Sequence, residues 1–575
     1  MSFSGIRPAV LVLAVLAALP AFAQDHWIRL KTAHFEMYTD ADEKKAIDGI
    51  LHFERVREFF MQVSPVRAPG EFPVRVVAFK DPQVMHVYAP NPGVAAYYAP
   101  GPVRDTIVMK DPVPDSYPVS IHEYMHLVIR HSGLRVPLWL NEGWSDVFST
   151  LKPVKDGVAV GDLIPRYMTI LGFAKWFTLP ELDAINNHSP EYNETARTSM
   201  YYAESWVLTH MLYLSPEYKE YFARFIGAMN RGMPLEQALL LAYNKTPNEV
   251  LADMQGYLLK KKLYGTVFLT PFEKSGETPV VTPLTGYETE VMKADLHAAA
   301  LHLGPATRAY QQLETDEPTQ PGAFEGAGYL ALQGGDKVKA RKEFTRAFAL
   351  GTNDPQMCLQ LAALDHEAKQ PASVVMDELE RAVKLRPDFP EAVFQLALMK
   401  VDLRDFEQAL TLLGRVGTVP PERMGVFRSA LAYCNLQRGN LTTARSDAEA
   451  AMRAAKMPAE KQSADRLIQL IEARSKGPAA ALSGETVVRK AGTAVGLRCA
   501  APGSGALSKM GINVDGRQLL LDLPDEAAVE IQRQPSSAKI ELKCGALPPF
   551  PLVVEYAPAS VANIQSAGII RRLEF

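Results

Sequence analysis

Residues 287–456 repeat with a period of 34 or 35 residues, and this periodicity constrains the fold more than any other feature of the chain. Small or aliphatic residues recur there in three series that keep the same steps. Each member of the second series follows the first by 12 residues, and each member of the third follows the second by 7. The series are Ala294, Gly328, Ala363, Ala397, Ala432; Ala306, Ala340, Val375, Ala409, Ala444; and Leu313, Ala347, Ala382, Val416, Ala451. A helical bundle without internal repeats is not expected to show three series of small residues with the same constant spacing.

This spacing is that of tetratricopeptide repeats, in which two helices pack closely where small residues face each other. We therefore predict five repeats over 287–456 and a capping helix over Glu460–Ser475, which together form an α-solenoid domain over 288–475. Stacked repeats build a concave surface that suits a peptide or a protein partner. The alternative is that this groove packs against other domains of the same chain. Four residues fall at positions that usually face the groove: Leu364, Phe394, Leu398 and Tyr433.

The length of 575 residues allows three or four domains at about 150 residues each. Lys and Arg total 61 and Asp and Glu total 65, so the net charge of −4 gives no support for a nucleic-acid partner. The 4 cysteines are too few for a scaffold built on disulfides. After residue 23, no apolar run approaches the roughly 20 residues that a transmembrane span needs.

The first 23 residues have the pattern of a secretory signal peptide. Arg7 supplies the positive charge, Ala9–Leu19 is an apolar stretch, and Ala21–Ala23 fits the small-x-small cleavage site. A membrane anchor is the alternative, but the apolar stretch is short and a cleavage site follows it. We therefore expect a periplasmic or secreted protein.

Residues 122–126, His-Glu-Tyr-Met-His, form an HExxH motif between Pro118 and Gly133, which suit the two ends of a helix. Residues i and i+4 lie on one face of a helix, so His122 and His126 can bind the same metal ion. Glu123 would then face the position left for a water molecule. The motif predicts a zinc site with Glu123 as a general base.

A second helix after Pro137 carries Glu142 and Asp146 among bulky apolar residues. Catalytic zinc takes three protein ligands and keeps one position open. Glu142 is the expected third ligand. Asp146, one turn later, is expected to accept the remaining ring N–H of a ligating histidine. A solvated helix face is the alternative for these carboxylates, and it fits poorly with their apolar neighbours.

The segments "HEYMH" and "PLWLNEGWSD" resemble the gluzincin metallopeptidases, the thermolysin and aminopeptidase-N-like group, and most of all its peptidase-MA-like branch. The resemblance covers roughly 30–270 and implies a zincin-type catalytic domain at 24–270. It also implies zinc bound by His122, His126 and Glu142, with Glu123 as the catalytic base. No "GxMEN"-type segment is present, so the aminopeptidase signature is missing.

Two further expectations follow from the same resemblance. The helix "MYYAESWVLTHML" resembles the family's Y-A-x-S helix, which makes Tyr202 the expected donor to the oxyanion, with Tyr201 as the alternative. Both tyrosines could instead be core aromatics. Gluzincins lay a peptide along an edge strand, and Thr106–Met109 is in the expected place, although it could be a plain sheet strand.

The rest of the chain divides into a linker and a last domain. Residues 271–287 are rich in Pro, Thr and Gly and are expected to be a linker, so that 24–270 would fold alone. Residues 482–575 are expected to form a small β-rich domain. Cys499 and Cys544 are expected to form its disulfide, and Cys358 and Cys434 to be buried thiols.

The sequence therefore predicts a multidomain α+β protein with a zincin-like domain, a repeat solenoid and a β-rich domain. The expected function is that of an exported zinc-dependent metallopeptidase, with repeats that bind a peptide or protein substrate or a partner. The alternative is a catalytically idle periplasmic repeat scaffold that uses the peptidase-like fold for binding.

Overall fold

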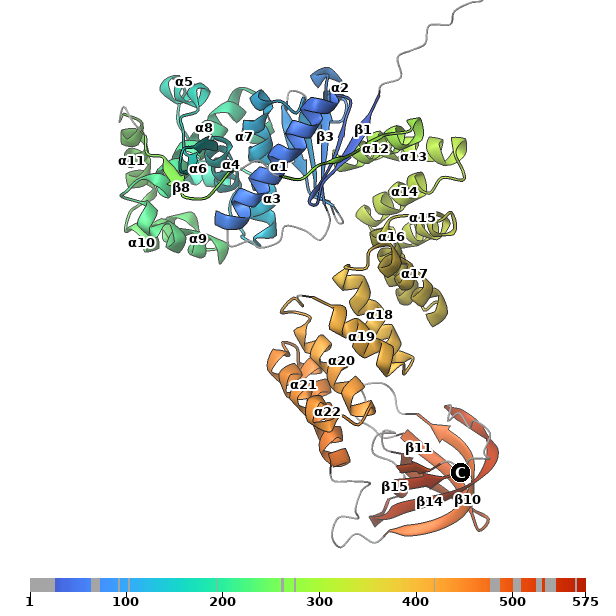
Figure 1. Ribbon diagram of the computed structural model, residues 1–575. Coiled ribbons are helices and arrows are strands. Elements are labelled where there is room, and N and C mark those ends of the chain that lie inside the picture. The colour runs from blue at the N-terminus through green and yellow to red at the C-terminus, as the bar shows by residue number, and fades with distance from the viewer. Residues whose placement is uncertain are drawn as a thin grey trace, which may run out of the picture. The chain divides into compact units, whose positions relative to one another are not determined.

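The computed structural model divides the chain into two compact units, Met1–Thr352 and Asn353–Phe575, which are taken in turn (Figure 1). The expected signal peptide lies outside the residues that the structure describes. These residues are 26–63, 73–91, 94–101, 104–193, 195–259, 263–272, 276–417, 419–475, 487–499, 508–523, 530–532, 544–563 and 566–575.

The first unit contains a six-stranded sheet with the strand order β4-β5-β3-β2-β1-β9. Strands β2, β3 and β5 run parallel, while β1, β9 and β4 pair antiparallel with their neighbours. The bounds are β1 Ile28–Lys31, β2 Phe35–Thr39, β3 Val74–Phe79, β4 Ala96–Ala99, β5 Thr106–Lys110 and β9 Val280–Pro283.

The expectation that Thr106–Met109 is an edge strand is wrong. These residues belong to β5, which pairs with β3 on one side and with β4 on the other. The chain reverses direction between β4 (Ala96–Ala99) and β5, and β4 is the edge strand of the sheet. The sequence of a hairpin of two short strands does not indicate which of the two strands lies at the edge of the sheet.

One face of this sheet packs against helices α1 (Glu43–Val63) and α3 (Tyr117–His131). Their apolar faces share a core with the strands, in which Phe35, Phe60 and Tyr124 are buried side chains. Helix α1 has its apolar residues at helical spacing, as its sequence predicts. The core continues into the helices that follow α3, so the helix that carries the HExxH motif belongs to a large apolar cluster.

The remaining elements before residue 270 are helical, apart from a three-stranded sheet of β6 Lys152–Val154, β7 Gly157–Val160 and β8 Thr266–Phe268. The helices are α2 Pro82–His86, α4 Leu138–Ser149, α5 Pro165–Phe173, α6 Leu179–Ala184, α7 Pro190–Asn193, α8 Thr195–Leu214, α9 Phe222–Asn230, α10 Leu235–Tyr243 and α11 Pro247–Leu259. A 3₁₀ turn, Pro114–Ser116, precedes α3, and another, Lys219–Tyr221, precedes α9.

The segment expected to be a linker, 271–287, contains an ordered strand. Val280–Pro283 forms β9, which pairs with β1 at the edge of the sheet. Helix α12 (Gly286–Ala299) follows at once and buries Met292 and Leu296 against the other face of the sheet. Pro and Thr suit an edge strand as well as a linker, so composition alone did not separate the two.

Helix α12 also forms a polar contact with the sheet. The Arg75 guanidinium donates to the Asp295 carboxylate at 2.6 Å, and Tyr310 donates to the same carboxylate at 2.7 Å. Tyr310 lies on α13 (Leu303–Asp316), the partner of α12. The first helix pair of the repeat region, α12 and α13, is thus attached to the sheet by apolar packing and by the ion pair between Arg75 and Asp295.

The repeat region consists of five helix pairs within the described residues, and their spacing is that of tetratricopeptide-like repeats. The first unit holds α12–α13 and the pair α14 (Gly322–Gln333) and α15 (Lys337–Ala349). Gly328 packs directly on the Phe344 ring, where a Cβ would lie 2.3 Å from a ring carbon. The small residue at this position therefore permits the close approach of the two helices.

The second unit holds the other three pairs and the capping helix. Their bounds are α16 Pro355–Glu367, α17 Ala372–Leu385, α18 Pro390–Asp402, α19 Phe406–Arg415, α20 Met424–Gln437, α21 Leu441–Ala454 and α22 Pro458–Ser475. Ala363 is exposed while its neighbour Ala362 is buried, so the first series of small residues is one position off in the third repeat. Of the expected groove residues, Leu364 and Phe394 are buried, while Leu398 and Tyr433 are half-buried.

The C-terminal part is a six-stranded sheet with the order β12-β11-β10-β14-β15-β13 and an additional pairing between β12 and β15. Its strands are β10 Val488–Arg498, β11 Ser508–Val514, β12 Arg517–Leu523, β13 Glu530–Gln532, β14 Gly545–Asn563 and β15 Ser566–Glu574. The β-rich character expected for this region is confirmed.

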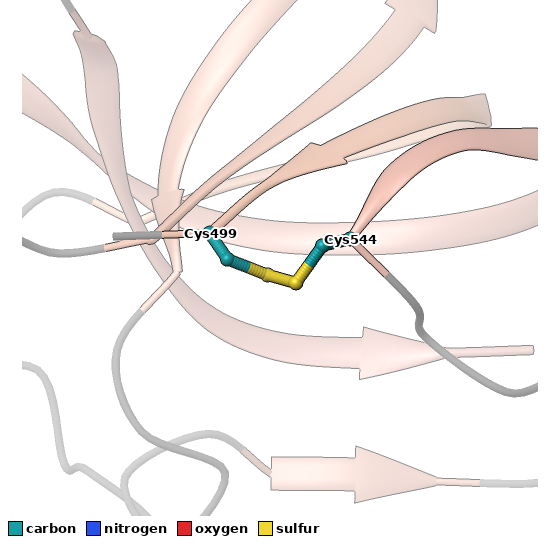
Figure 2. Close-up of a disulfide and its surroundings, with 2 residues drawn as sticks. All are labelled: Cys499 and Cys544. Atoms are coloured by element: carbon teal, nitrogen blue, oxygen red, sulfur yellow. A yellow bond between two sulfur atoms is a disulfide. The ribbon is translucent and has the colours of Figure 1, made fainter. Parts of the chain in front are cut away.

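The disulfide between Cys499 and Cys544 is confirmed, and Figure 2 shows it joining the end of β10 to the start of β14. The adjacent residues Leu497 and Gly545 are register partners in the two strands, so the bond closes the end of this ladder. The other two cysteines, Cys358 and Cys434, are buried thiols outside any disulfide, as expected. Within the described ranges, no helix combines the length and the apolar character needed to cross a bilayer.

Candidate metal centre

Helices α3 and α4 carry the expected site residues and are joined by a short loop. Pro118 lies in the first turn of α3, where its missing N–H costs no helical hydrogen bond. The helix ends at His131, and Gly133 follows with a φ of 70°, which glycine adopts without strain. Pro137 then precedes the first turn of α4. The short loop that these residues form allows α3 and α4 to pack against each other, with the HExxH residues opposite Glu142.

Three acceptor atoms converge between the helices. Nε2 of His122 and Nε2 of His126 lie 3.1 Å apart, and their distances to Oε2 of Glu142 are 3.3 and 3.5 Å. The side chain of Glu142 is only 4% exposed, and its Oε2 has no hydrogen-bond partner within the described residues. The two imidazoles stand nearly at right angles, with an angle of 88° between their planes.

This spacing fits a small tetrahedral cation. Ligand atoms at about 2.0–2.1 Å around such an ion lie about 3.3–3.4 Å apart. The three observed separations, 3.1, 3.3 and 3.5 Å, bracket that value. Two imidazole nitrogens and one carboxylate oxygen are a donor set that zinc uses. The residues present therefore fit a zinc ion at this place.

The Nδ1 atom of each imidazole contacts polar side chains of α4. Nδ1 of His122 donates to Oδ1 of Asp146 at 3.0 Å. Nδ1 of His126 lies 3.0 Å from Oδ1 of Asn141 and 3.1 Å from Oγ of Ser145. Because a carboxylate and an amide oxygen only accept, these contacts keep the proton on Nδ1 and turn both Nε2 lone pairs toward Glu142.

Asp146 is itself held by a tyrosine from α5. Tyr167 donates to Oδ2 of Asp146 at 2.7 Å, and the Arg166 guanidinium donates to the Tyr167 hydroxyl at 3.1 Å. The same guanidinium lies over the Tyr167 ring, 4.8 Å from its centroid. Both carboxylate oxygens of the buried Asp146 are therefore satisfied, so its orientation toward His122 is fixed.

The cluster attracts positive charge. Burial lowers the pKa of His122, but the Asp146 and Glu142 carboxylates outweigh it, and the pKa lies well above its ordinary value. Burial raises the pKa of Glu142, and His126 and His122 outweigh this effect, so that its pKa is lowered. The Nε2 side of the site thus stabilises a cation, either a proton or a metal ion.

Glu123 lies on α3 beside the cluster, close enough for His122, His126 and Glu142 to affect its pKa. Burial raises the pKa of its carboxyl, and His122 and His126 offset part of this rise. The backbone of Tyr98, on the edge strand β4, lies near this carboxylate and lowers its pKa to a smaller extent. A buried carboxylate of raised pKa next to a cation site is suited to exchange protons.

The edge strand is tied to the end of α3 through Asp105. The Tyr98 hydroxyl donates to Oδ1 of Asp105 at 2.5 Å, and His131 Nε2 donates to Oδ2 at 2.6 Å. His131 is thus off the metal face, as its position five residues after the motif predicts. This contact holds β4 next to Glu123.

Helix α8 closes the site from the other side of α4. A Cβ on Gly143 would lie 2.1 Å from the Ser205 carbonyl oxygen and 2.3 Å from Thr209 Oγ1. Only glycine permits this crossing of α4 and α8. The crossing brings the tyrosines of α8 next to Glu142, the neighbour of Gly143 in the chain.

Of the two tyrosines considered for the oxyanion, Tyr202 lies beside the carboxylates. Its phenol is close enough to Glu142 and Glu123 for both to raise its pKa, in addition to burial. Tyr202 hydrogen-bonds Tyr192, whose hydroxyl donates to Oε1 of Glu142 at 3.0 Å. Tyr201 is fully buried, with its ring edge-on to both Tyr192 and Tyr202.

The structure brings together every residue that the sequence singled out for the site. Four further contributors were missed. Asn141 precedes Glu142 directly, and Ser145 lies one turn after Asn141 on the same helix face, so this i, i+4 pair could have been suggested from the sequence. Tyr167 and Tyr192 come from α5 and α7, and no local pattern in the sequence connects them with the motif.

No protein-family model matches the sequence, and no curated protein matches it. Several solved structures are similar to part of the chain. YrrB, described as a TPR protein with an unusual peptide-binding site, is 18% identical over 31% of this chain and 90% of its own, with a TM-score of 0.27. MamA is 15% identical over 30% of this chain and 95% of its own, with a TM-score of 0.23.

PilF of Pseudomonas aeruginosa is 12% identical over 43% of this chain and 96% of its own, with a TM-score of 0.26. Likenesses at this level carry no argument about function. The description of the repeats therefore rests on the helix pairs themselves.

Proposed function

We propose that this protein is an exported, zinc-dependent peptidase whose active site lies between α3 and α4. The observation that carries the proposal is the convergence of His122, His126 and Glu142 on one point, at separations of 3.1–3.5 Å. Zinc, when bound there, supplies a Lewis acid that makes water a nucleophile at neutral pH and polarises a carbonyl. The resemblance of the two motifs to gluzincins supports the same reaction class.

Glu123 is the proposed general base. Its carboxylate takes a proton from the attacking water and returns it to the leaving amine nitrogen. Burial raises its pKa, which makes it a better base than an exposed glutamate. The nearby Tyr98 backbone favours the ionised form of this carboxyl by lowering its pKa.

Tyr202 is the proposed donor to the oxyanion that forms when water attacks. Its position near both Glu142 and Glu123 supports this role, while the full burial of Tyr201 disfavours the alternative. A donor aimed at developing charge is worth about 3–4 kcal/mol to such a reaction.

The proposed substrate is a peptide or an unfolded protein segment that pairs with β4. Among the residues that the structure describes, the edge position of Ala96–Ala99 leaves one side of this strand without a partner strand in the sheet. Pairing through the main chain accepts many side chains, which favours a broad specificity. The repeat region is proposed to bind a protein substrate or partner, and the expected signal peptide supports a periplasmic or secreted location.

Metal analysis of the purified full chain tests the proposal, together with a peptide and protein cleavage screen with and without chelator. We expect about one zinc per chain and cleavage that the chelator abolishes and added zinc restores. Stoichiometric zinc without cleavage across a broad panel would favour the idle scaffold. Absence of bound zinc under the same conditions would contradict the metal site itself.

A further inference from the structure

We infer that Tyr192 is a positioning residue that makes Glu142 offer a single oxygen, Oε2, to the metal site. This inference rests on the proposed function, because it concerns how the third ligand is presented. Tyr192 lies on the short helix α7, far in sequence from both metal-site helices, and nothing in the sequence marks it as part of the site.

The two oxygens of Glu142 have different surroundings. Oε2 faces the Nε2 atoms of His122 and His126 at 3.3 and 3.5 Å. Oε1 accepts a hydrogen bond from the Tyr192 hydroxyl at 3.0 Å. The Glu142 side chain is 4% exposed, so water cannot easily replace this hydroxyl. The tyrosine thus decides which oxygen is left for a cation.

The consequence concerns the open position of the site. A carboxylate can bind a metal through one oxygen or through both. When Oε1 is engaged by a phenol, only Oε2 is available, and the site keeps a fourth position for water, as catalytic zinc requires. When Oε1 is free, it can turn toward the metal and occupy that position.

Tyr192 is itself held from two sides. Its ring packs edge-on against Tyr201, with the centroids 5.7 Å apart, and lies 6.1 Å from the Tyr202 ring. Its hydroxyl also accepts a hydrogen bond from Tyr202. The series Tyr202 to Tyr192 to Glu142 therefore joins the proposed oxyanion donor to a proposed ligand.

Tyr192→Phe tests the inference, because it removes the hydroxyl and keeps the ring in its packing. The full chain is loaded with zinc to measure affinity by competition with a chelating dye, and with Co²⁺ to record the visible absorption. Co²⁺ absorbs strongly when four-coordinate and weakly when five-coordinate. We expect Tyr192→Phe to lose zinc affinity about 10–100-fold, as changes behind a ligand usually do, and to weaken the Co²⁺ band.

Two matched variants separate this role from others. Tyr202→Phe should keep the zinc affinity and the Co²⁺ spectrum, since the hydroxyl that donates to Oε1 of Glu142 is that of Tyr192, although it should lose cleavage. Tyr213→Phe, on α8 like Tyr202, should change neither property, because its ring packs on Trp144 and Phe222. Circular dichroism of the metal-free variants verifies that each is folded.

The Co²⁺ spectrum of Tyr192→Phe shows whether Tyr192 controls how Glu142 binds the metal. A changed Co²⁺ spectrum in Tyr192→Phe supports the inference, with or without the loss of affinity. An unchanged spectrum overturns it, even if affinity falls, because the change would then be general loosening of the site. A parent chain that binds neither Zn²⁺ nor Co²⁺ would instead overturn the proposed function, and the inference with it.

Discussion

Asp146, whose side chain is buried, accepts a hydrogen bond from Nδ1 of His122 at 3.0 Å. The contact keeps the His122 proton on the side away from Glu142. It also places a buried negative charge behind the proposed ligand His122, which raises the basicity of Nε2. Tyr167 completes the arrangement by donating to the other carboxylate oxygen at 2.7 Å.

Asp146→Asn should therefore weaken zinc binding about 10–100-fold while the chain stays folded. The amide keeps the size of the side chain but loses the charge, and its NH₂ group can face the ring in place of an acceptor. Zinc affinity measured by dye competition verifies this. Asp183→Asn is the matched control, since Asp183 accepts from Trp139 and not from a ligating histidine. Equal affinities for the parent chain and Asp146→Asn would refute the role of Asp146.

Gly143→Ala should destabilise the N-terminal domain by about 1–3 kcal/mol, because the new methyl group would overlap the Ser205 carbonyl and force α4 and α8 apart. Chemical denaturation gives the free energy of unfolding. Gly256→Ala, in α11, is the control, because a Cβ there meets nothing within 4 Å and should add about 0.5–1 kcal/mol of helix stability. A neutral Gly143→Ala would mean that the two helices do not cross this closely.

A fragment of residues 24–270 should be less stable than one of residues 24–316. The shorter fragment lacks β9 and α12, so the far face of the sheet, with Trp27 and Phe79, loses its cover. Burial of Met292 and Leu296 alone contributes about 3–6 kcal/mol, at roughly 1.5–3 kcal/mol each. Solubility and thermal melting compare the two fragments. Equal stability would restore the view that 271–287 is a plain linker.

Thiol labelling of the denatured, unreduced protein should count two cysteines, Cys358 and Cys434. After reduction all 4 should react. Loss of the Cys499–Cys544 bond should destabilise the C-terminal sheet by about 4 kcal/mol for a loop of 45 residues. Four labelled thiols before reduction would show that the bond does not form.

The sequence predicted the elements whose signal is local. The HExxH spacing, the Asp146 position one turn after Glu142 and the period of the repeats all follow from helix geometry, which relates residues a few positions apart. The order of strands at the sheet edge could not be predicted, since β4 and β5 form a hairpin whose outer strand is chosen by the packing of β3. The same applies to β9, which reads as a linker by composition.

Tyr192 and Tyr167 illustrate the remaining gap in the site. Each reaches a metal-site carboxylate from a separate helix, and the contact depends on how α5, α7 and α8 pack around α4. No spacing rule relates such residues to a motif 20 to 70 positions earlier in the chain. The one hint is Gly143, since a glycine inside a helix often marks a close approach of another element.

Glu123→Gln, measured for both bound zinc and cleavage, tests the central claim most directly. Glutamine keeps the size of the side chain and removes the base, so we expect the variant to hold zinc as the parent does while losing cleavage by several orders of magnitude. His126→Ala and Glu142→Ala should lose the metal as well as the activity. If Glu123→Gln cleaves peptides as fast as the parent, Glu123 is not the base and the proposed mechanism is wrong.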